Sequence, residues 1–202
     1  MSWSYFMKTS NLTKTIVITG LAIALAFVLS LVRIPFVFGT SITAASTLPI
    51  ILICLHEKRG WSFATTFIYS LLHLFVAIVR DGVLSWGLIS TQLIWCILLD
   101  YVLPYTLIGI MSFFKKSKEK WMILGIFLVF LLNLTCHVLS GYFIFSYFGQ
   151  WNFFGKVFEG KAFLYSLCFN ALHVVPEFII TTIVFLAISK IKIVKEFLFL
   201  NF

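Results

Sequence analysis

Long apolar runs separated by short polar segments make up almost the whole of this chain. A helix needs about 20 apolar residues to cross the hydrocarbon core of a bilayer. Six apolar runs lie at residues 15–32, 42–55, 61–79, 88–114, 121–145 and 162–189. The pattern predicts an all-α polytopic membrane protein with six transmembrane helices, folded as a single transmembrane domain over residues 1–202.

The run over residues 42–55 is the shortest and has the smallest side chains. It contains Pro49 and a cluster of small residues from Thr43 to Thr47. Small side chains let helix backbones approach one another closely in a membrane. We therefore expect a second helix over 42–55 that packs against its neighbours.

The composition supports the membrane class. Hydrophobic residues make up 61% of the 202 positions and charged residues 11%, whereas a soluble domain has about 45–50% and about 25%. No length is left for a separate soluble domain. Lys8 and Lys14 precede the first apolar run, but no clear small-residue cleavage site follows it, so we expect a retained helix and not a signal peptide.

The basic residues predict the orientation of the chain in the membrane. Most of the 15 Lys and Arg residues lie near the two termini, in the turn 56–60 or in the link 115–120. Six spans place these segments on one side, and positive residues concentrate on the cytoplasmic side. We therefore expect a multi-pass protein of the plasma membrane with both termini in the cytoplasm, and with 33–41, 80–87 and 146–161 outside. The net charge of +8 follows from this bias and implies no nucleic-acid partner.

Asp100 is an acid within the otherwise apolar run 88–114. A charge at the centre of a membrane helix costs roughly 2.5–3.5 kcal/mol on insertion scales. A chain that keeps Asp100 there needs a compensating partner, which could be a residue, a metal ion, a proton or a ligand. Intramembrane acids are functional sites by default.

Other polar residues occupy the predicted outer halves of the later helices. His137 lies in the run 121–145, and Tyr165 and Asn170 lie in the run 162–189. The loop 146–161 is rich in aromatic residues and could cover them. Together with Asp100 they suit a cationic aromatic ligand, because a carboxylate balances its charge, rings stack on it and polar groups orient it.

Structural roles for the same residues stay open. Asn170 could join helices by hydrogen bonds, and His137 could serve helix packing alone. Glu177, four residues after His173, is expected to pair with that histidine or with backbone groups freed by Pro176.

Enzyme chemistry finds little support in the spacing. The four cysteines stand singly in apolar runs, and the chain contains no HExxH motif. Asp100, His137, His173 and Glu177 could still bind a metal ion, which leaves an intramembrane metalloenzyme as a minor alternative. No GxSxG nucleophile elbow is present.

Gly20 and Ala24 in the first run are four residues apart, as are Ala22 and Ala26. Small residues at this spacing form a helix face that allows close packing. The face could pack within the chain or dock on another membrane subunit.

Several motifs resemble the thiamine-specific substrate-binding (S) component of energy-coupling factor (ECF) transporters, the YuaJ/ThiT family. The resemblance runs from about Thr15 to Ile188, and its most specific part is the Tyr-Ser-Leu-x-x-Asn motif from Tyr165 to Asn170 with the following Pro176-Glu177. Shorter matches are Ala24-Leu25-Ala26-Phe27, Leu48-Pro49-Ile50, Leu99-Asp100-Tyr101, and His137 with Ser140-Gly141.

The resemblance implies a six-helix protein that captures thiamine from outside, without enzyme activity or a cofactor. It implies an ECF transmembrane coupling subunit and two ATPase subunits as partners, with Gly20 and Ala24 at the contact. The ligand-binding residues that it implies are Asp100, Tyr101, His137, Tyr165 and Asn170, with Tyr147 and Trp151 as candidates in the aromatic loop. Some members have Glu in place of Asp100, so another vitamin or a thiamine precursor is an alternative ligand.

The alternative hypothesis, from another functional class, is a stand-alone proton-coupled transporter. Under this hypothesis Asp100 is the proton site. No GxxxxGK[ST] phosphate-binding loop is present, so ATP hydrolysis would fall to partner subunits.

Overall fold

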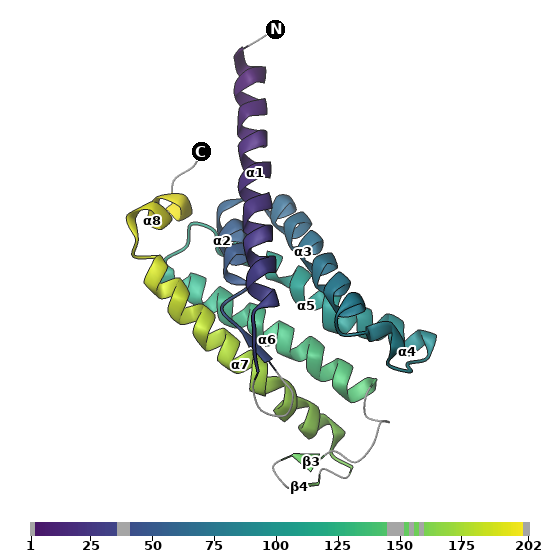
Figure 1. Ribbon diagram of the computed structural model, residues 1–202. Coiled ribbons are helices and arrows are strands. Elements are labelled where there is room, and N and C mark those ends of the chain that lie inside the picture. The colour runs from purple at the N-terminus through teal and green to yellow at the C-terminus, as the bar shows by residue number, and fades with distance from the viewer. Residues whose placement is uncertain (1–2, 36–40, 145–151, 154–155, 158–159, 200–202) are drawn as a thin grey trace.

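The computed structural model in Figure 1 describes residues 3–35, 41–144, 152–153, 156–157 and 160–199. Most of this part of the chain is helical, as the apolar runs predict. The helices are α1 (Trp3–Leu31), α2 (Leu48–His56), α3 (Arg59–Val79), α4 (Ser90–Cys96), α5 (Leu103–Thr106), α6 (Glu119–Phe143), α7 (Ala162–Ile188) and α8 (Lys192–Phe199). Two short hairpins pair β1 (Arg33–Pro35) with β2 (Ser41–Thr43) and β3 (Asn152–Phe153) with β4 (Lys156–Val157).

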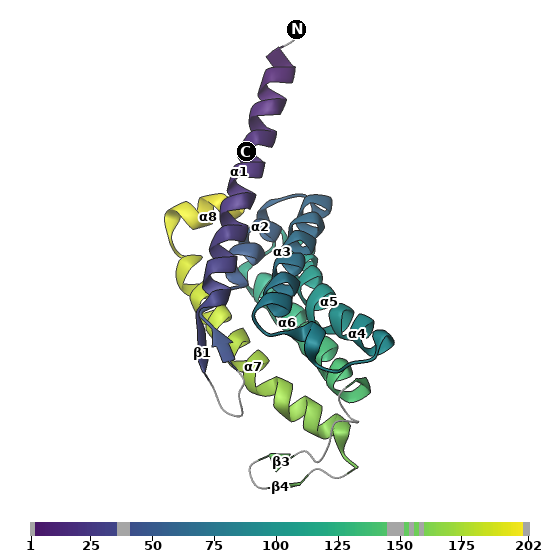
Figure 2. The same cartoon turned by 45° about the vertical axis from the view of Figure 1, so that its right-hand side comes forward.

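Five helical stretches are long and apolar enough to cross a membrane within the described ranges. They are Leu12–Leu31, Arg59–Val79, Ser90–Phe114, Glu119–Phe143 and Ala162–Ile188. The chain is therefore an all-α polytopic membrane protein. The start of α1 and the helix α8 lie at the same end of the molecule, whereas β3 and β4 lie at the other end (Figures 1 and 2).

The prediction of a continuous helix over 42–55 is wrong in its first half. Residues Ser41–Thr43 form strand β2, and α2 begins only at Leu48 and has 9 residues. Pro49 lies in the first turn of α2, where its missing N–H costs no hydrogen bond. A helix of this length rises only about 14 Å, so α2 does not cross a bilayer by itself, and six spans stay a prediction.

The predicted fourth helix is one stretch with changing hydrogen-bond registers. α4 passes into a π-helical turn over Ile97–Val102, then into α5, and then into a 3-10 segment over Leu107–Phe114. Pro104 has no N–H to return to the carbonyl of Asp100, so a regular α-helix cannot continue through this point. The wider π turn carries Asp100 and Tyr101, and such turns often occur at functional sites.

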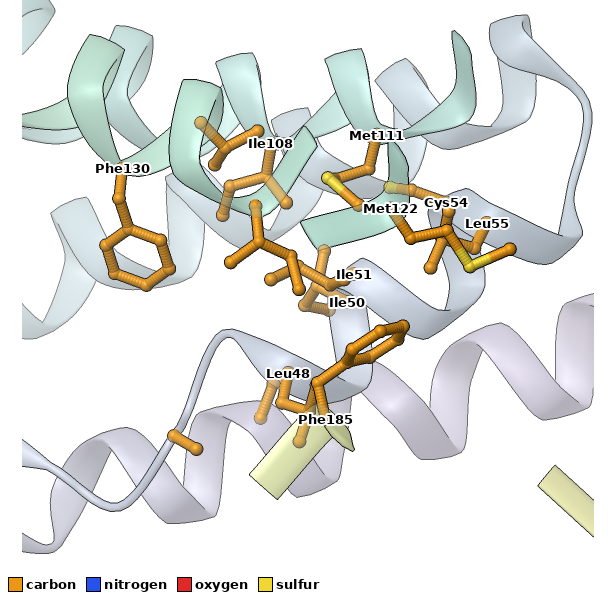
Figure 3. Close-up of a cluster of buried hydrophobic side chains, with 14 of the residues drawn as sticks. Leu48, Ile50, Ile51, Cys54, Leu55, Ile108, Met111, Met122, Phe130 and Phe185 are labelled. Atoms are coloured by element: carbon orange, nitrogen blue, oxygen red, sulfur yellow. The ribbon is translucent and has the colours of Figure 1, made fainter. Parts of the chain in front are cut away.

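The apolar core gathers around the short helix α2 (Figure 3). Ile50, Ile51 and Leu55 of α2 are fully buried, and Met122 of α6 and Phe185 of α7 pack into the same cluster. A helix that is apolar on all sides is stable when other helices surround it. The long helices therefore enclose α2, and they hold it and the preceding strand in a fixed place.

The first hairpin lies between α1 and α2. Arg33 pairs with Thr43 and Pro35 with Ser41 in antiparallel register. β2 also contacts α7, and Figure 2 shows the hairpin beside that helix. The hairpin thus brings the hydroxyl groups of residues 41–46 to the middle of α7.

Candidate functional site

A cavity of about 500 Å³ lies between the first hairpin, the π-helical turn, α6 and α7. This volume is within the usual range for small-molecule sites. Five of the predicted ligand-binding residues line it together, although they come from three separate stretches of the chain. They are Asp100, Tyr101, His137, Tyr165 and Asn170. The other two predicted residues, Tyr147 and Trp151, lie outside the described residues.

Both carboxylate oxygens of Asp100 have partners from the protein. His137 Nδ1 lies 2.9 Å from Oδ1. Ser140 donates its hydroxyl hydrogen to Oδ2, and Cys96 Sγ lies 3.4 Å from the same oxygen. Asp100 and His137 keep side-chain exposures of 15% and 16%, so the pair is largely withdrawn from solvent while still bordering the cavity.

The helical spacing explains why these groups meet. His137 and Ser140 are three residues apart on α6 and therefore share a face. Cys96 lies four residues before Asp100, where an α-helix brings side chains together. Asp100 thus receives partners from its own helix and from α6, and its position in the cavity is fixed from both sides.

Asn170 joins α7 to α6. Its Nδ2 donates to the Ser166 carbonyl at 2.9 Å and to the His137 carbonyl at 3.3 Å. Ser166 Oγ donates to the carbonyl of Val138 at 2.9 Å. Asn170 therefore has the structural role that the sequence left open, and it also borders the cavity beside the Asp100–His137 pair.

Gly141 allows α6 and α7 to approach at this point. A Cβ atom built on Gly141 would lie 2.1 Å from Ser166 Oγ and 3.0 Å from Ser166 Cβ. No side chain larger than hydrogen fits here unless the side chain of Ser166 shifts. The glycine therefore sets the distance between the two walls that carry His137 and Asn170.

Aromatic rings supply flat surfaces in the cavity. Tyr165 stacks on Phe169 with ring centroids 5.9 Å apart and planes inclined by 16°. On another wall, His73 of α3 stacks on Tyr105 at 3.8 Å, and Tyr69 meets His73 edge-on at 4.6 Å. His73 and Tyr105 are cavity residues that the sequence analysis missed, although a histidine within an apolar run is itself a signal.

Glu177 also lines the cavity, with partners other than those expected. Pairing with His173 or with backbone groups near Pro176 was predicted, but Glu177 Oε1 accepts a hydrogen bond from Thr43 and lies 3.4 Å from Ser46 Oγ. Thr43 Oγ1 and Ser46 Oγ are 2.7 Å apart. The prediction was wrong because it considered only residues of α7. The partners of Glu177 belong to the first hairpin and to the turn that follows it.

An ion pair ties the first hairpin to the segment that precedes α4. Arg33 Nη1 and Nη2 lie 3.1 and 3.2 Å from the two carboxylate oxygens of Asp81. Trp86 Nε1 donates to the carbonyl of Asp81 at 3.0 Å. Arg33 and Trp86 both line the cavity, so this polar link forms part of its wall.

The small-residue face of α1 is divided between two uses. Ala26 is fully buried against the core. Gly20 and Ala24 are exposed, and a Cβ atom built on Gly20 meets nothing within 4 Å. The close-packing surface at Gly20 and Ala24 is therefore open within the described part of the chain.

A family model described as "Thiamine transporter protein (Thia_YuaJ)" matches residues 16–196. The match includes all the helices from α2 to α7 and every cavity residue discussed above. No curated protein matches the sequence.

Proposed function

Because the chain belongs to the Thia_YuaJ family of thiamine transporter proteins, we propose that it captures thiamine from outside the cell in the cavity around Asp100. The family gives the chain a role in thiamine transport as a multi-pass membrane protein. The family is one of transporters and not of enzymes. Beyond the family, we propose the capture step, the binding residues and the coupling to other subunits.

The gathering of Asp100, His137, Tyr165 and Asn170 around one cavity carries the proposal. Thiamine joins an aminopyrimidine ring to a positively charged thiazolium ring. A carboxylate accepts hydrogen bonds from the amino group, and the stacked pair of Tyr165 and Phe169 offers a flat surface for a ring. Polar groups that orient a ligand between apolar and aromatic surfaces are typical of small-molecule sites.

We further propose that both termini lie in the cytoplasm and that the cavity opens outward. The basic segments favour this orientation, and the positions of α1 and α8 at one end of the molecule agree with it (Figure 1). An ECF coupling subunit and two ATPase subunits would then supply the energy. The open face at Gly20 and Ala24 is where the coupling subunit is proposed to dock.

Titration of the purified chain with thiamine tests the capture step through quenching of tryptophan fluorescence. We expect saturable binding that Asp100→Asn weakens about 10- to 100-fold, because a charged hydrogen-bond partner contributes about 1.5–3 kcal/mol. Glu119→Gln is the matched control, since Glu119 lies at the start of α6, about 27 Å of helix axis before His137. A folded wild-type chain that does not bind thiamine would overturn the proposal.

A stand-alone proton-coupled transporter is the second candidate, and the contact between Asp100 and His137 favours it as a proton-binding pair. Transport assays on vesicles that contain this chain alone distinguish the proposed capture function from proton-coupled transport. Under the proposed function they bind thiamine but accumulate none when a pH gradient is applied. Accumulation driven by the gradient, lost in Asp100→Asn, would establish the second candidate.

A further inference from the structure

We propose that Glu177 is the counter-ion for the positive charge of the ligand, so that the cavity recognises an organic cation through a second acid in addition to Asp100. This inference rests on thiamine capture in the same cavity and assigns a specificity-determining residue to it. Thr43 and Ser46 are positioning residues that hold the carboxylate.

Glu177 lies on the cavity face of α7. The lining residues of this helix are spaced by three and four positions and form one continuous stripe. They are Ala162, Tyr165, Ser166, Phe169, Asn170, His173, Val174 and Glu177. From Tyr165 to Glu177 the stripe covers about 18 Å of helix axis at 1.5 Å per residue, so Glu177 ends a wall that begins at the proposed outer mouth.

The two acids of the cavity differ in their partners. Asp100 lies 2.9 Å from the ring nitrogen Nδ1 of His137, a basic side chain. Glu177 takes its partners from Thr43 and Ser46, through both hydroxyl groups and the backbone of Thr43, and no Lys, Arg or His forms an ion pair with it in the described part of the chain. Glu177 is therefore the cavity acid that has no basic side chain as a partner.

A carboxylate in a membrane helix without a cation is costly. Buried charges are normally paired, because the loss of hydration is only partly offset by neutral hydrogen bonds. Thr43 and Ser46 both contact the same oxygen, Oε1, and these neutral partners bring no positive charge to the acid. A bound cation would supply the missing charge, and the cavity gives it access.

The two acids line one cavity of about 500 Å³. The rings of His137 and His173 have centroids 5.7 Å apart. Glu177 follows His173 by four residues, which places it one turn further along the same face. A molecule with an amino group at one end and a positive ring at the other can therefore reach Asp100 and Glu177 together.

Aromatic rings near this end suit a positive ring. His73 and Tyr105 form a stacked pair on the cavity wall, with Tyr69 edge-on to Tyr105 at 5.7 Å. The face of a tyrosine ring attracts a cation, and the attraction grows when water is excluded. The carboxylate and the rings together favour a positively charged heterocycle over a neutral one of equal shape.

The test compares thiamine with a neutral isostere in which carbon replaces the thiazolium nitrogen. The measured quantity is the charge preference, defined as the Kd of the isostere divided by the Kd of thiamine, obtained by calorimetry on the purified full chain. In the wild type we expect a preference of about 10- to 100-fold. Glu177→Gln should reduce it to near one, and Glu177→Asp should retain most of it.

Asp100→Asn distinguishes the two acids. It should weaken both ligands by similar factors and leave the charge preference intact. A preference that survives in Glu177→Gln, or that disappears in Asp100→Asn, would overturn the inference. If Glu177→Gln does not fold, the charge preference of Asp100→Asn still tests the inference, because its loss in that variant would overturn the role of Glu177.

The same measurements distinguish a failure of the proposed function from a failure of the role proposed for Glu177. A wild-type chain that binds neither compound would refute thiamine capture itself. A wild-type chain that binds both compounds equally well would leave capture in place and refute only the role of Glu177.

Discussion

At the scale of single residues, the carboxylate of Asp100 is held by side chains from its own helix and from α6. The sequence required a partner for this acid, and the spacing on the later helices placed His137 in the same layer. The structure adds Ser140 and Cys96 as partners. The hydroxyl partners of Glu177 could not be predicted, because they lie more than 130 positions earlier in the chain and no local pattern links them.

Removal of the Thr43 hydroxyl should destabilise the protein. Thr43→Val keeps the shape of the side chain but leaves the Glu177 carboxylate with one hydroxyl partner fewer. We expect a loss of about 1–3 kcal/mol in the free energy of unfolding, the usual cost of an unsatisfied buried polar group. Thermal unfolding in detergent measures it.

Thr135→Val is the control for that change. Thr135 is exposed, and its only hydroxyl partner among the described residues is the carbonyl of Leu131 in its own helix. We expect a change within about 0.5 kcal/mol there, as for most surface substitutions. Equal effects of the two substitutions would mean that the Thr43 contact contributes no specific stability.

At the scale of the elements, the apolar runs predict the long helices well. The third run, 61–79, corresponds to α3 at Arg59–Val79, and the sixth run, 162–189, to α7 at Ala162–Ile188. The run 42–55 fails because hydrophobicity reports burial and not backbone conformation. A strand, a turn and a short helix that are all buried look the same as one helix.

The π-helical turn at Asp100 could not be predicted either, because it is also a feature of the backbone. Side-chain hydrophobicity carries no information about which carbonyl each N–H meets. Pro104 is the one local signal, since it shows that the regular register cannot pass through it.

The contact between α6 and α7 should depend on the absence of a side chain at Gly141. Gly141→Ala forces a methyl group against Ser166, and we expect a loss of about 1–3 kcal/mol in stability from overpacking. Because Ser166 must shift beside Asn170, whose Nδ2 bonds its hydroxyl group, thiamine affinity should fall as well. Calorimetric titration and thermal unfolding of the same preparation measure both effects.

Two further variants make that test specific. Gly20→Ala adds the same methyl group where nothing lies within 4 Å, so its stability should stay equal or rise slightly. Gly141→Ala combined with Ser166→Gly removes the clashing side chain and should recover part of the lost stability. No recovery in the double variant would show that the clash is not the cause.

At the scale of the whole molecule, the arrangement separates the ligand cavity from the open face of α1. The cavity lies between the first hairpin, α6 and α7, whereas Gly20 and Ala24 are exposed on α1. The sequence predicted both features, but only the structure shows that Ala26 serves internal packing and that Gly20 and Ala24 do not. Separate substitutions can therefore test the proposed binding and the proposed coupling.

Bulky residues on the open face should uncouple transport from binding. Gly20→Leu with Ala24→Leu blocks a close helix contact, and we expect thiamine uptake by cells with the complete transporter to fall about tenfold or more, a loss of at least about 1.4 kcal/mol at the contact. Thiamine affinity of the purified variant should match that of the wild type. Radiolabelled uptake and fluorescence titration measure the two quantities.

Val79→Leu provides the control, because Val79 is exposed at the end of α3 and the change preserves its apolar character. Uptake should be unaffected. Loss of thiamine affinity in the Gly20 and Ala24 variant would show that the face belongs to the binding fold and not to a docking site.

The burial of α2 has a consequence for the biogenesis of the protein. α2 leaves the ribosome early, but residues that surround it, such as Ile108, Met122 and Phe185, are synthesised much later. A helix of 9 residues is too short to be released into the bilayer as a span of its own. The first hairpin and α2 can therefore form their packing contacts only after α6 and α7 have been inserted. The cavity proposed to bind thiamine is completed only at this last step, so a chain truncated before α7 would be inserted in the membrane without it.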